Sequence, residues 1–170
     1  MRYIDSGRRD PAETLGAWLH QQLENGVSEL RVQSGFFNAA PLGLLREALS
    51  ALAENDRVAH VVLGSNSPGT LAGDVRQLLR MMGLPREQGR LGVVKFSNAI
   101  FHPKTYHIRR ADGSQAAYVG SANFTGQGLS LHVEAGLIAD SRDGDSSDLL
   151  DRIASTVDSM FADPPEGMHV

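Results

Sequence analysis

The sequence contains no cysteine, only two lysines and no long apolar run. Without cysteine the chain can form neither a disulfide nor a thiolate metal site, so we expect it in a reducing compartment, the cytoplasm. No apolar run approaches the roughly 20 residues that a membrane helix needs. The residues after Met1 also lack the apolar stretch that is typical of a signal peptide. We therefore expect no membrane association.

The remaining composition is that of a globular protein of 170 residues, with 41% hydrophobic and 21% charged residues. This length suits one domain with a sizeable core, and we expect residues 1–170 to form it. After 161, Asp163-Pro164-Pro165 breaks the last helix, so 161–170 is predicted to be a loose tail.

Apolar periodicity predicts alternating strands and helices in the first part of the chain and clustered strands afterwards. This order predicts an α/β fold, in which a mixed β-sheet carries helices on both faces. The loop at 64–70 follows a buried strand and is predicted to line the rim of a site. Helices are predicted from Asp10-Pro11 to Asn25-Gly26, from Ala40-Pro41 to Asn55-Asp56, over 71–82 and around 150–161, and strands over 29–37, 58–63, 91–96, 101–119 (a hairpin) and 131–137.

Residues 101–124 carry the densest group of polar side chains. His102 and Lys104 lie two residues apart in an apolar-polar alternation, which in a strand places both on one face. A turn signal at 111–114 and a returning strand at 115–119 complete a hairpin. The segment 120–124, Gly-Ser-Ala-Asn-Phe, allows close approach of a ligand to the backbone and offers a hydroxyl and an amide.

This pair of motifs, H-x-K followed by G-S-x-N-F, resembles the phospholipase D superfamily. The resemblance implies that His102 is a nucleophile that attacks phosphorus, that Lys104 and Asn123 bind the phosphoryl oxygens, and that Ser121 sits beside them. Glu134 resembles the glutamate of the bacterial nuclease branch, which includes metal-independent restriction endonucleases. There it implies a hydrogen bond to the nucleophilic histidine. The resemblance also implies a phospholipase D-like sheet.

One position departs from the family pattern. The family carries an aspartate seven residues after the histidine, usually in a structural role, and this chain has Arg109 there. Asp112 is nearby but lies in the turn. This departure gives some weight to an inactive module that binds DNA or dimerises within a restriction or helicase-type system.

The same residues make chemical sense by themselves. A phosphodiester is anionic, so attack on it requires neutralised non-bridging oxygens, and a neutral imidazole can form a covalent phosphohistidine. The chain has 14 arginines beside its 2 lysines, so Lys104 indicates a position that needs a compact ammonium. Each half of the motif alone is better explained by exposed strand residues and a turn. Both halves together, with Glu134, favour the phosphodiesterase.

The net charge of −4 argues against a basic coat, so binding of a nucleic acid needs a local patch. Lys95, Arg109 and Arg110 are the predicted substrate-binding residues near the motif, and Arg8-Arg9 is a further candidate pair. Arg109 and Arg110 are equally explained as solvated residues beside a turn. A phospholipid remains the alternative substrate; an exposed apolar rim would favour it, and the sequence shows none.

No metal ion or other cofactor is expected, because H-E-x-x-H and ligand-spaced carboxylate clusters are absent from the sequence. His102 and His107 are predicted on opposite strand faces. The phosphohistidine route requires two imidazoles, and this chain has one motif. We therefore predict a homodimer with one shared active site, in which the second His102 comes from the other subunit.

Overall fold

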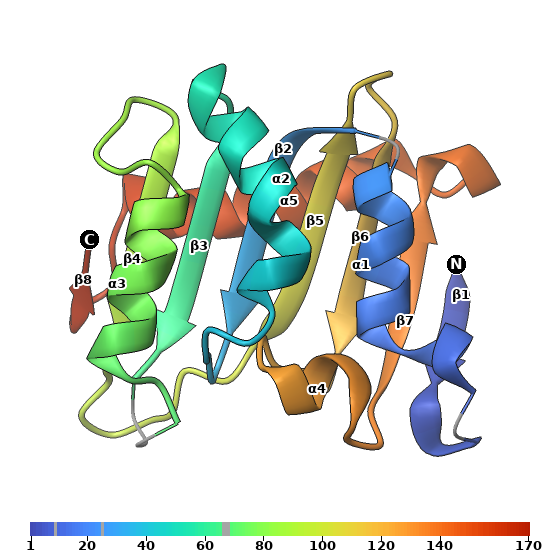
Figure 1. Ribbon diagram of the computed structural model, residues 1–170, viewed down its shortest axis with the longest axis horizontal. Helices are drawn as coiled ribbons and strands as arrows, with labels where there is room; N and C mark the ends of the chain where they lie inside the picture. The colour runs from blue at the N-terminus through green and yellow to red at the C-terminus, as the bar shows by residue number, and fades with distance from the viewer. Residues whose placement is uncertain (9, 25, 66–68) are drawn as a thin grey trace.

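The structure is a computed structural model that describes all residues except 9, 25 and 66–68. Its eight strands form one mixed sheet in the order β1-β7-β6-β5-β2-β3-β4-β8 (Figure 1). The predicted α/β fold with a mixed sheet is confirmed. The strands are β1 (Arg2–Asp5), β2 (Val27–Ser34), β3 (Ala59–Gly64), β4 (Gly89–Val94), β5 (Lys104–Arg110), β6 (Gln115–Gly120), β7 (Ala135–Asp140) and β8 (Met168–His169).

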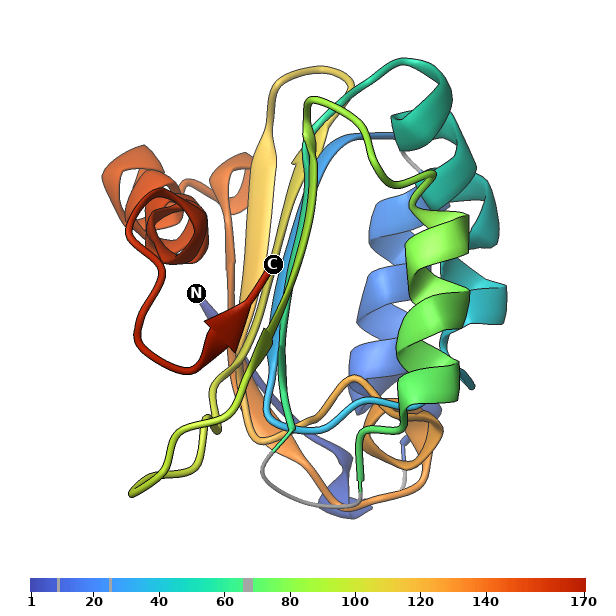
Figure 2. The same ribbon diagram turned by 90° about the vertical axis from the view of Figure 1, so that its left-hand side faces the viewer.

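Helices cover both faces of the sheet, as predicted. α1, α2 and α3 lie on one face and α5 crosses the other (Figure 2). The short α4 connects β6 to β7. The helices span α1 (Leu15–Glu24), α2 (Leu42–Glu54), α3 (Ala72–Met81), α4 (Gly126–Ser130) and α5 (Ser147–Ala162), and the 3-10 turns span Ser6–Arg8, Pro11–Glu13 and Ser141–Asp143.

Apolar spacing explains why these helices pack on the sheet. In α2, Leu42, Leu45, Leu49 and Leu52 recur at helical intervals and are all buried. They join the larger core between the sheet and the three helices on that face. On the other face, Val157 of α5 packs with Val62, Val94 and Phe101, whereas Leu150 covers Ala117 and Ala139.

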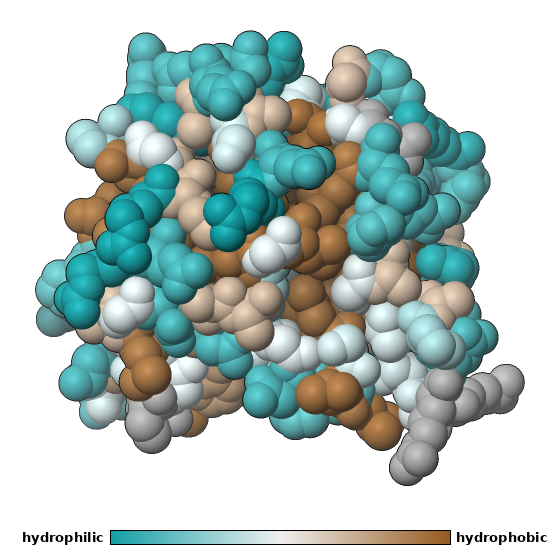
Figure 3. All heavy atoms as spheres, in the orientation of Figure 1, coloured by the Kyte–Doolittle hydropathy of each residue, from teal (hydrophilic) through white to brown (hydrophobic). Residues whose placement is uncertain are grey.

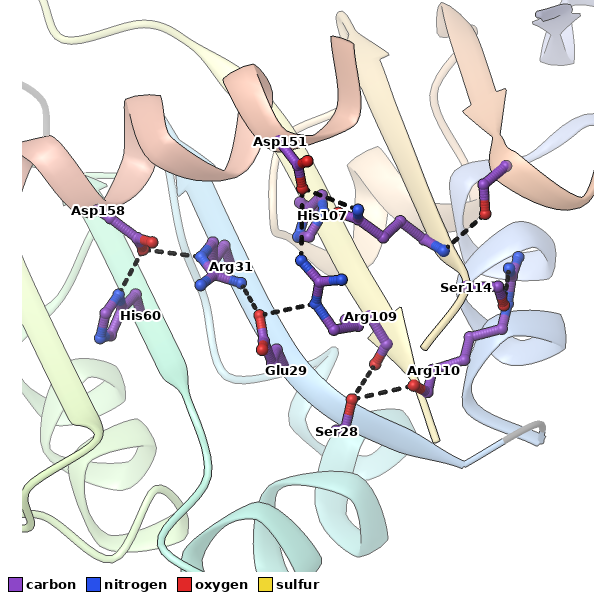
Figure 4. A network of polar contacts seen from close by, with 12 residues as sticks. Ser28, Glu29, Arg31, His60, His107, Arg109, Arg110, Ser114, Asp151 and Asp158 are labelled. Atoms are coloured by element: carbon purple, nitrogen blue, oxygen red, sulfur yellow. Dashed lines mark hydrogen bonds and ion pairs between the residues drawn. The ribbon is translucent and has the colours of Figure 1, made fainter. Parts of the chain in front are cut away.

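A polar layer also ties α5 to the sheet (Figure 4). Asp158 of α5 accepts hydrogen bonds from Arg31 Nε and His60 Nδ1, both at 2.7 Å. Arg31 also pairs with Glu29 at 2.6 Å, so the buried guanidinium has a carboxylate on each side. Partial burial by itself would raise the pKa of Asp158. The hydrogen bonds from His60 and Arg31 outweigh this effect and lower the pKa to about 2. His60 is a satisfied histidine in the protein interior rather than a catalyst.

Strand direction creates one edge of the sheet that matters for function. β2, β3 and β4 are parallel, whereas β5 is antiparallel to β2, β6 to β5 and β7 to β6. The carboxyl ends of β2, β3, β4 and β6 therefore lie beside the amino ends of β5 and β7, at the lower edge in Figure 1. We call this the site edge. Its strand ends are Ser34, Gly64, Val94, Lys104, Gly120 and Ala135.

Three predictions about the chain are corrected. The strand predicted over 131–137 begins only at Ala135, so Glu134 lies just before it. Asp10 caps a 3-10 turn through a 2.9 Å hydrogen bond from Ala12 N, and the α-helix begins only at Leu15. The predicted loose tail over 161–170 is instead attached to the sheet. Residues 168–169 form β8 and pair with β4, and Lys95 N donates to Gly167 O at 2.8 Å.

Candidate functional site

The site edge brings together all the predicted catalytic residues. Lys104 is the first residue of β5, and His102 lies in the loop before it. Ser121 and Asn123 follow β6, and Glu134 directly precedes β7. Because β5, β6 and β7 are neighbours in the sheet, three chain segments converge here. The position of this edge, at the carboxyl ends of parallel strands, is where ligands bind in open α/β sheets.

His102 is exposed, whereas Lys104 is almost fully buried, with 6% of its surface exposed. The Lys104 ammonium donates to the backbone oxygen of His102 at 2.8 Å. Burial lowers the pKa of Lys104 below its ordinary value, and the nearby Glu134 carboxylate partly offsets this. The prediction that His102 and Lys104 share a strand face is corrected, because β5 begins only at Lys104.

Two glycines set the position of the His102 loop. A Cβ atom on Gly35 would lie 2.8 Å from His102 Cδ2. One on Gly64 would lie 2.5 Å from Gly35 O and 2.8 Å from Phe101 O. Backbones can therefore approach each other here only without side chains. Phe36 completes the support, because its ring meets the His102 imidazole edge-on at 5.5 Å between centroids.

Asn123 is held with its amide nitrogen available. Its Oδ1 accepts from Phe36 N at 3.1 Å, and this bond assigns the amide orientation. Its Nδ2 has no hydrogen-bond partner within the described part of the chain. Ser34 fixes the same segment, because its Oγ donates to Phe36 O at 2.6 Å and accepts from Phe124 N at 2.8 Å. Asn123 can thus donate a hydrogen bond to an anionic ligand.

Glu134 contacts Ser121 rather than His102. Glu134 Oε2 accepts from Ser121 Oγ, and Glu134 Oε1 lies 3.8 Å from His132 Nδ1. Ser121 Oγ also accepts from Ala135 N at 3.0 Å. Among the described residues no contact joins Glu134 to His102, so the hydrogen bond implied by the family resemblance is not present in this chain by itself. The carboxylate instead lies between a serine and a second, exposed histidine.

The predicted substrate-binding arginines lie at the opposite end of β5. Arg110 is 2% exposed, and its guanidinium bonds Gln22, Ser114 and Asp140. Figure 4 shows Arg110 beside Ser114. Arg109 pairs with Glu29 at 3.3 Å and with Asp151 at 3.4 Å. The prediction that they lie beside the motif and bind substrate there is therefore corrected: both guanidinium groups are already paired with carboxylates of this chain, at the other end of the strand.

Lys95 is exposed and directly follows β4, so it lies at the site edge. Three strand spacings separate β4 from β5, about 14 Å. Arg9 and residues 66–68 of the predicted rim loop lie outside the described residues. The loop begins at the site edge with Gly64, and beyond the gap Thr70 Oγ1 accepts from Phe37 N at 3.1 Å.

His107 does not belong to the site. It is fully buried beneath α5, and its Nε2 lies 2.7 Å from Gln115 Oε1. Burial lowers its pKa to about 4, so the imidazole is neutral near pH 7. In the described ranges no group of three or more His, Cys, Asp or Glu side chains is placed to hold a metal ion. Nor does any described helix have the length and apolar character to cross a membrane.

Three residues that build the site are not among the predicted site residues. Phe36 supports His102, Ser34 fixes the Asn123 segment, and Ser6 bonds the backbone at 132–134. The Ser34-Gly35-Phe36 order after an apolar strand is a local signal for the first two. Nothing local signals Ser6, because its partners lie more than a hundred residues away in the chain.

Comparisons with known proteins agree with this geometry. A family model described as "Cardiolipin synthase, PLD-like domain" matches residues 19–162. No curated protein sequence matches. The fold is similar to the crystal structure of a phospholipase D family member, Nuc, from Salmonella typhimurium, with a TM-score of 0.56, 14% identity, and coverage of 95% of this chain and 93% of that one.

Two further solved structures share the fold. NucT from Helicobacter pylori gives a TM-score of 0.59 at 12% identity, covering 95% of this chain and 94% of that one. Polyphosphate kinase from Porphyromonas gingivalis gives 0.63 at 17% identity, covering 97% of this chain and 26% of that one. At these identities the structures show the fold alone. The family match extends over most of the sequence, and the chain belongs to the phospholipase D superfamily of phosphodiesterase-type enzymes.

Proposed function

We propose that this protein is a metal-independent phosphodiesterase that cleaves nucleic acid through a covalent phosphohistidine, most simply as an endonuclease. The observation that carries the proposal is the convergence of His102, Lys104, Ser121, Asn123 and Glu134 at one edge of the sheet. An exposed imidazole stands there beside a buried ammonium and an amide donor without a partner among the described residues. This is the set of groups that an in-line attack on a phosphodiester requires.

The chemistry proceeds in two displacements. In the first, the His102 imidazole attacks phosphorus, the bond from phosphorus to the leaving oxygen breaks, and a second imidazole donates a proton to that oxygen. In the second, that imidazole takes a proton from water, and the oxygen of that water displaces the histidine from phosphorus. Lys104 and Asn123 neutralise the non-bridging oxygens in both transition states.

The second imidazole is proposed to come from another copy of this chain. His60 and His107 lie beneath α5, away from the site edge. A surface suited to a partner exists beside the site. Tyr3, Leu137 and Val119 are paired side by side on β1, β7 and β6, and each is at least 45% exposed. Exposed apolar residues on adjacent strands favour burial against a protein surface.

The decisive experiment is cleavage of supercoiled plasmid in excess EDTA. We expect the parent protein to nick or linearise the plasmid and His102→Ala to lose at least roughly 10³-fold of this activity. His20→Ala is the matched control, because His20 is equally a solvent-facing histidine but lies on α1. Activity that disappears with EDTA and returns with magnesium, or His102→Ala cleaving at the parent rate, would refute the mechanism.

The shared site has its own test. Sedimentation at the assay concentration is expected to give a dimer, and dimers mixed from one parent and one His102→Ala subunit are expected to lose most activity. Mixed dimers that retain half the parent rate would show two independent sites. A fully active monomer would exclude the shared site and direct attention to His132, which stands beside Glu134.

A second candidate substrate is a phospholipid, and one observation favours it. Ile100, Leu131 and Val133 flank His102 and Glu134 in the sequence and are 63%, 77% and 71% exposed. The structure thus supplies an apolar rim that the sequence did not reveal, and apolar surface is visible at the lower edge of the molecule (Figure 3). Release of headgroup from vesicles, with the plasmid left intact, would establish this substrate instead.

A further inference from the structure

Ser6 joins the end of β1 to the segment that carries Glu134. The β1–β7 ladder ends at the Asp5–Ala135 pair. The next hydrogen bonds between the two segments are made by the backbone and the hydroxyl of Ser6. Ser6 N donates to Glu134 O at 3.0 Å, and Ser6 Oγ accepts from Glu134 N at 2.8 Å. The hydroxyl is also within donor distance of two carbonyl oxygens, His132 O at 3.0 Å and Glu134 O at 3.2 Å. Ser6 is 8% exposed, so these bonds are shielded from solvent.

The residues around this clamp have little freedom. A Cβ on Gly7 would lie 3.2 Å from Val133 Cγ1, so the two segments are in close contact. On the other side, His132 N donates to Gln127 O at 2.8 Å. The backbone over 132–134 is therefore held from both directions, although the side chains of His132 and Val133 are exposed.

Glu134 projects from this fixed backbone into the site. Its carboxylate accepts from Ser121 Oγ and lies near the Lys104 ammonium. The direction of a carboxylate is set by the backbone that carries it, and a misplacement of about 1 Å in an active site costs up to roughly 10²-fold in rate. The Ser6 hydroxyl thus bonds the backbone from which this carboxylate projects.

We infer that Ser6 is a positioning residue for the active site, which fixes the Glu134 backbone so that the carboxylate holds Ser121 and balances the charge of Lys104. This inference rests on the proposed phosphodiesterase function. Ser6 does not touch the substrate, and its effect passes through Glu134 alone. Removing the hydroxyl leaves Glu134 N and His132 O without the partner they have here and loosens the segment that carries the carboxylate.

The first test compares Ser6→Ala with Ser28→Ala. Ser28 is the matched control, because its Oγ also bonds two backbone carbonyls, Arg109 O at 3.1 Å and Arg110 O at 3.0 Å, but at the opposite edge of the sheet. With a chromogenic phosphodiester, Ser6→Ala is expected to lower kcat by about 10- to 100-fold and to change KM by less than about twofold. Ser28→Ala is expected to keep the parent kcat. Equal kcat values for the folded variants would overturn the inference.

Ser6→Cys provides a second variant that keeps the packing. Its thiol nearly matches the hydroxyl in shape but is a weak hydrogen-bonding group, so kcat is expected to fall here as well. A folded Ser6→Cys protein with the parent kcat would contradict the role of the hydroxyl.

A double-mutant cycle with Glu134→Gln tests the route of the effect. If Ser6 acts through Glu134, Ser6→Ala lowers kcat in the parent but causes less than about a twofold further loss in the Glu134→Gln background. Losses that multiply would show an independent, structural effect and overturn the inference. Failure of the proposed function is a separate outcome, because the parent protein itself would then leave the phosphodiester intact.

Discussion

Replacing Arg110 by methionine tests whether this arginine supports the fold or binds substrate. The guanidinium donates to Gln22 Oε1 at 3.0 Å, to Ser114 Oγ at 3.0 Å and to Asp140 Oδ1 at 3.1 Å. Removing one partner of a buried ion pair costs about 3–5 kcal/mol. Asp140 keeps its hydrogen bond from Arg142 N at 2.9 Å, and methionine fills much of the volume. We therefore expect a loss at the lower end, about 3 kcal/mol.

Urea unfolding followed by circular dichroism measures this loss, and it corresponds to a fall of about 6–12 °C in Tm for a chain of this size. If the protein binds DNA as proposed, the salt dependence of its affinity is expected to stay unchanged, because the Arg110 guanidinium is buried against Gln22, Ser114 and Asp140. Arg46→Met, at an exposed position on α2, serves as the control and should leave stability within about 0.5 kcal/mol. If Arg110→Met keeps the parent stability but loses DNA affinity, the reasoning is refuted and Arg110 belongs to the binding surface.

Two further predictions concern Lys104 and His107, two buried side chains whose pKa values are lowered by burial. Lys104→Ala is expected to lower kcat by about 10²- to 10³-fold, because it removes one donor to the charge that develops in the transition state. Lys104→Arg should lose a similar amount, since the planar guanidinium does not fit a position where only 6% of the lysine is exposed. Full activity in Lys104→Arg would show that charge alone matters. The pKa of His107 is near 4 when folded and about 6.5 when unfolded. Because this pKa is depressed in the folded state, stability should fall by up to about 3 kcal/mol as pH drops from 6.5 to 4. Urea titrations of the parent and His107→Leu measure this, and an equal pH dependence in both proteins would contradict the assignment.

Much of the fold follows from local patterns, and the failures have physical causes. Regular apolar spacing predicted α2 and α5 because their burial repeats with the helical period. The N-terminal signal at Asp10-Pro11 was correct as a cap, but the turn after it is only a short 3-10 segment. β8 spans two residues, and its pairing with β4 comes from a contact about 75 residues away in the chain. A propensity summed over two residues cannot indicate such a strand.

The candidate site, like the fold, could be predicted from the sequence only in part. The residue types and their spacing place His102, Lys104 and Asn123 at one edge, because a hairpin fixes which residues of neighbouring strands meet. The partner of the Glu134 carboxylate does not follow from spacing. It depends on the direction of the backbone before β7, and that direction is set by β1, the first strand of the chain, through the β1–β7 ladder and the bonds of Ser6.

The contact between Glu134 and Ser121 has a consequence for the proposed dimer. Within one chain His102 has no carboxylate partner among the described residues, whereas Glu134 already accepts from Ser121 and has its second oxygen 3.8 Å from His132. A nucleophilic imidazole needs a group that fixes its tautomer. If the second copy supplies the second imidazole, it also brings a second Glu134 to the same place. The interaction that the family resemblance implies for Glu134 can then form between subunits, and in the proposed dimer each chain would depend on its partner for both the proton donor and the carboxylate.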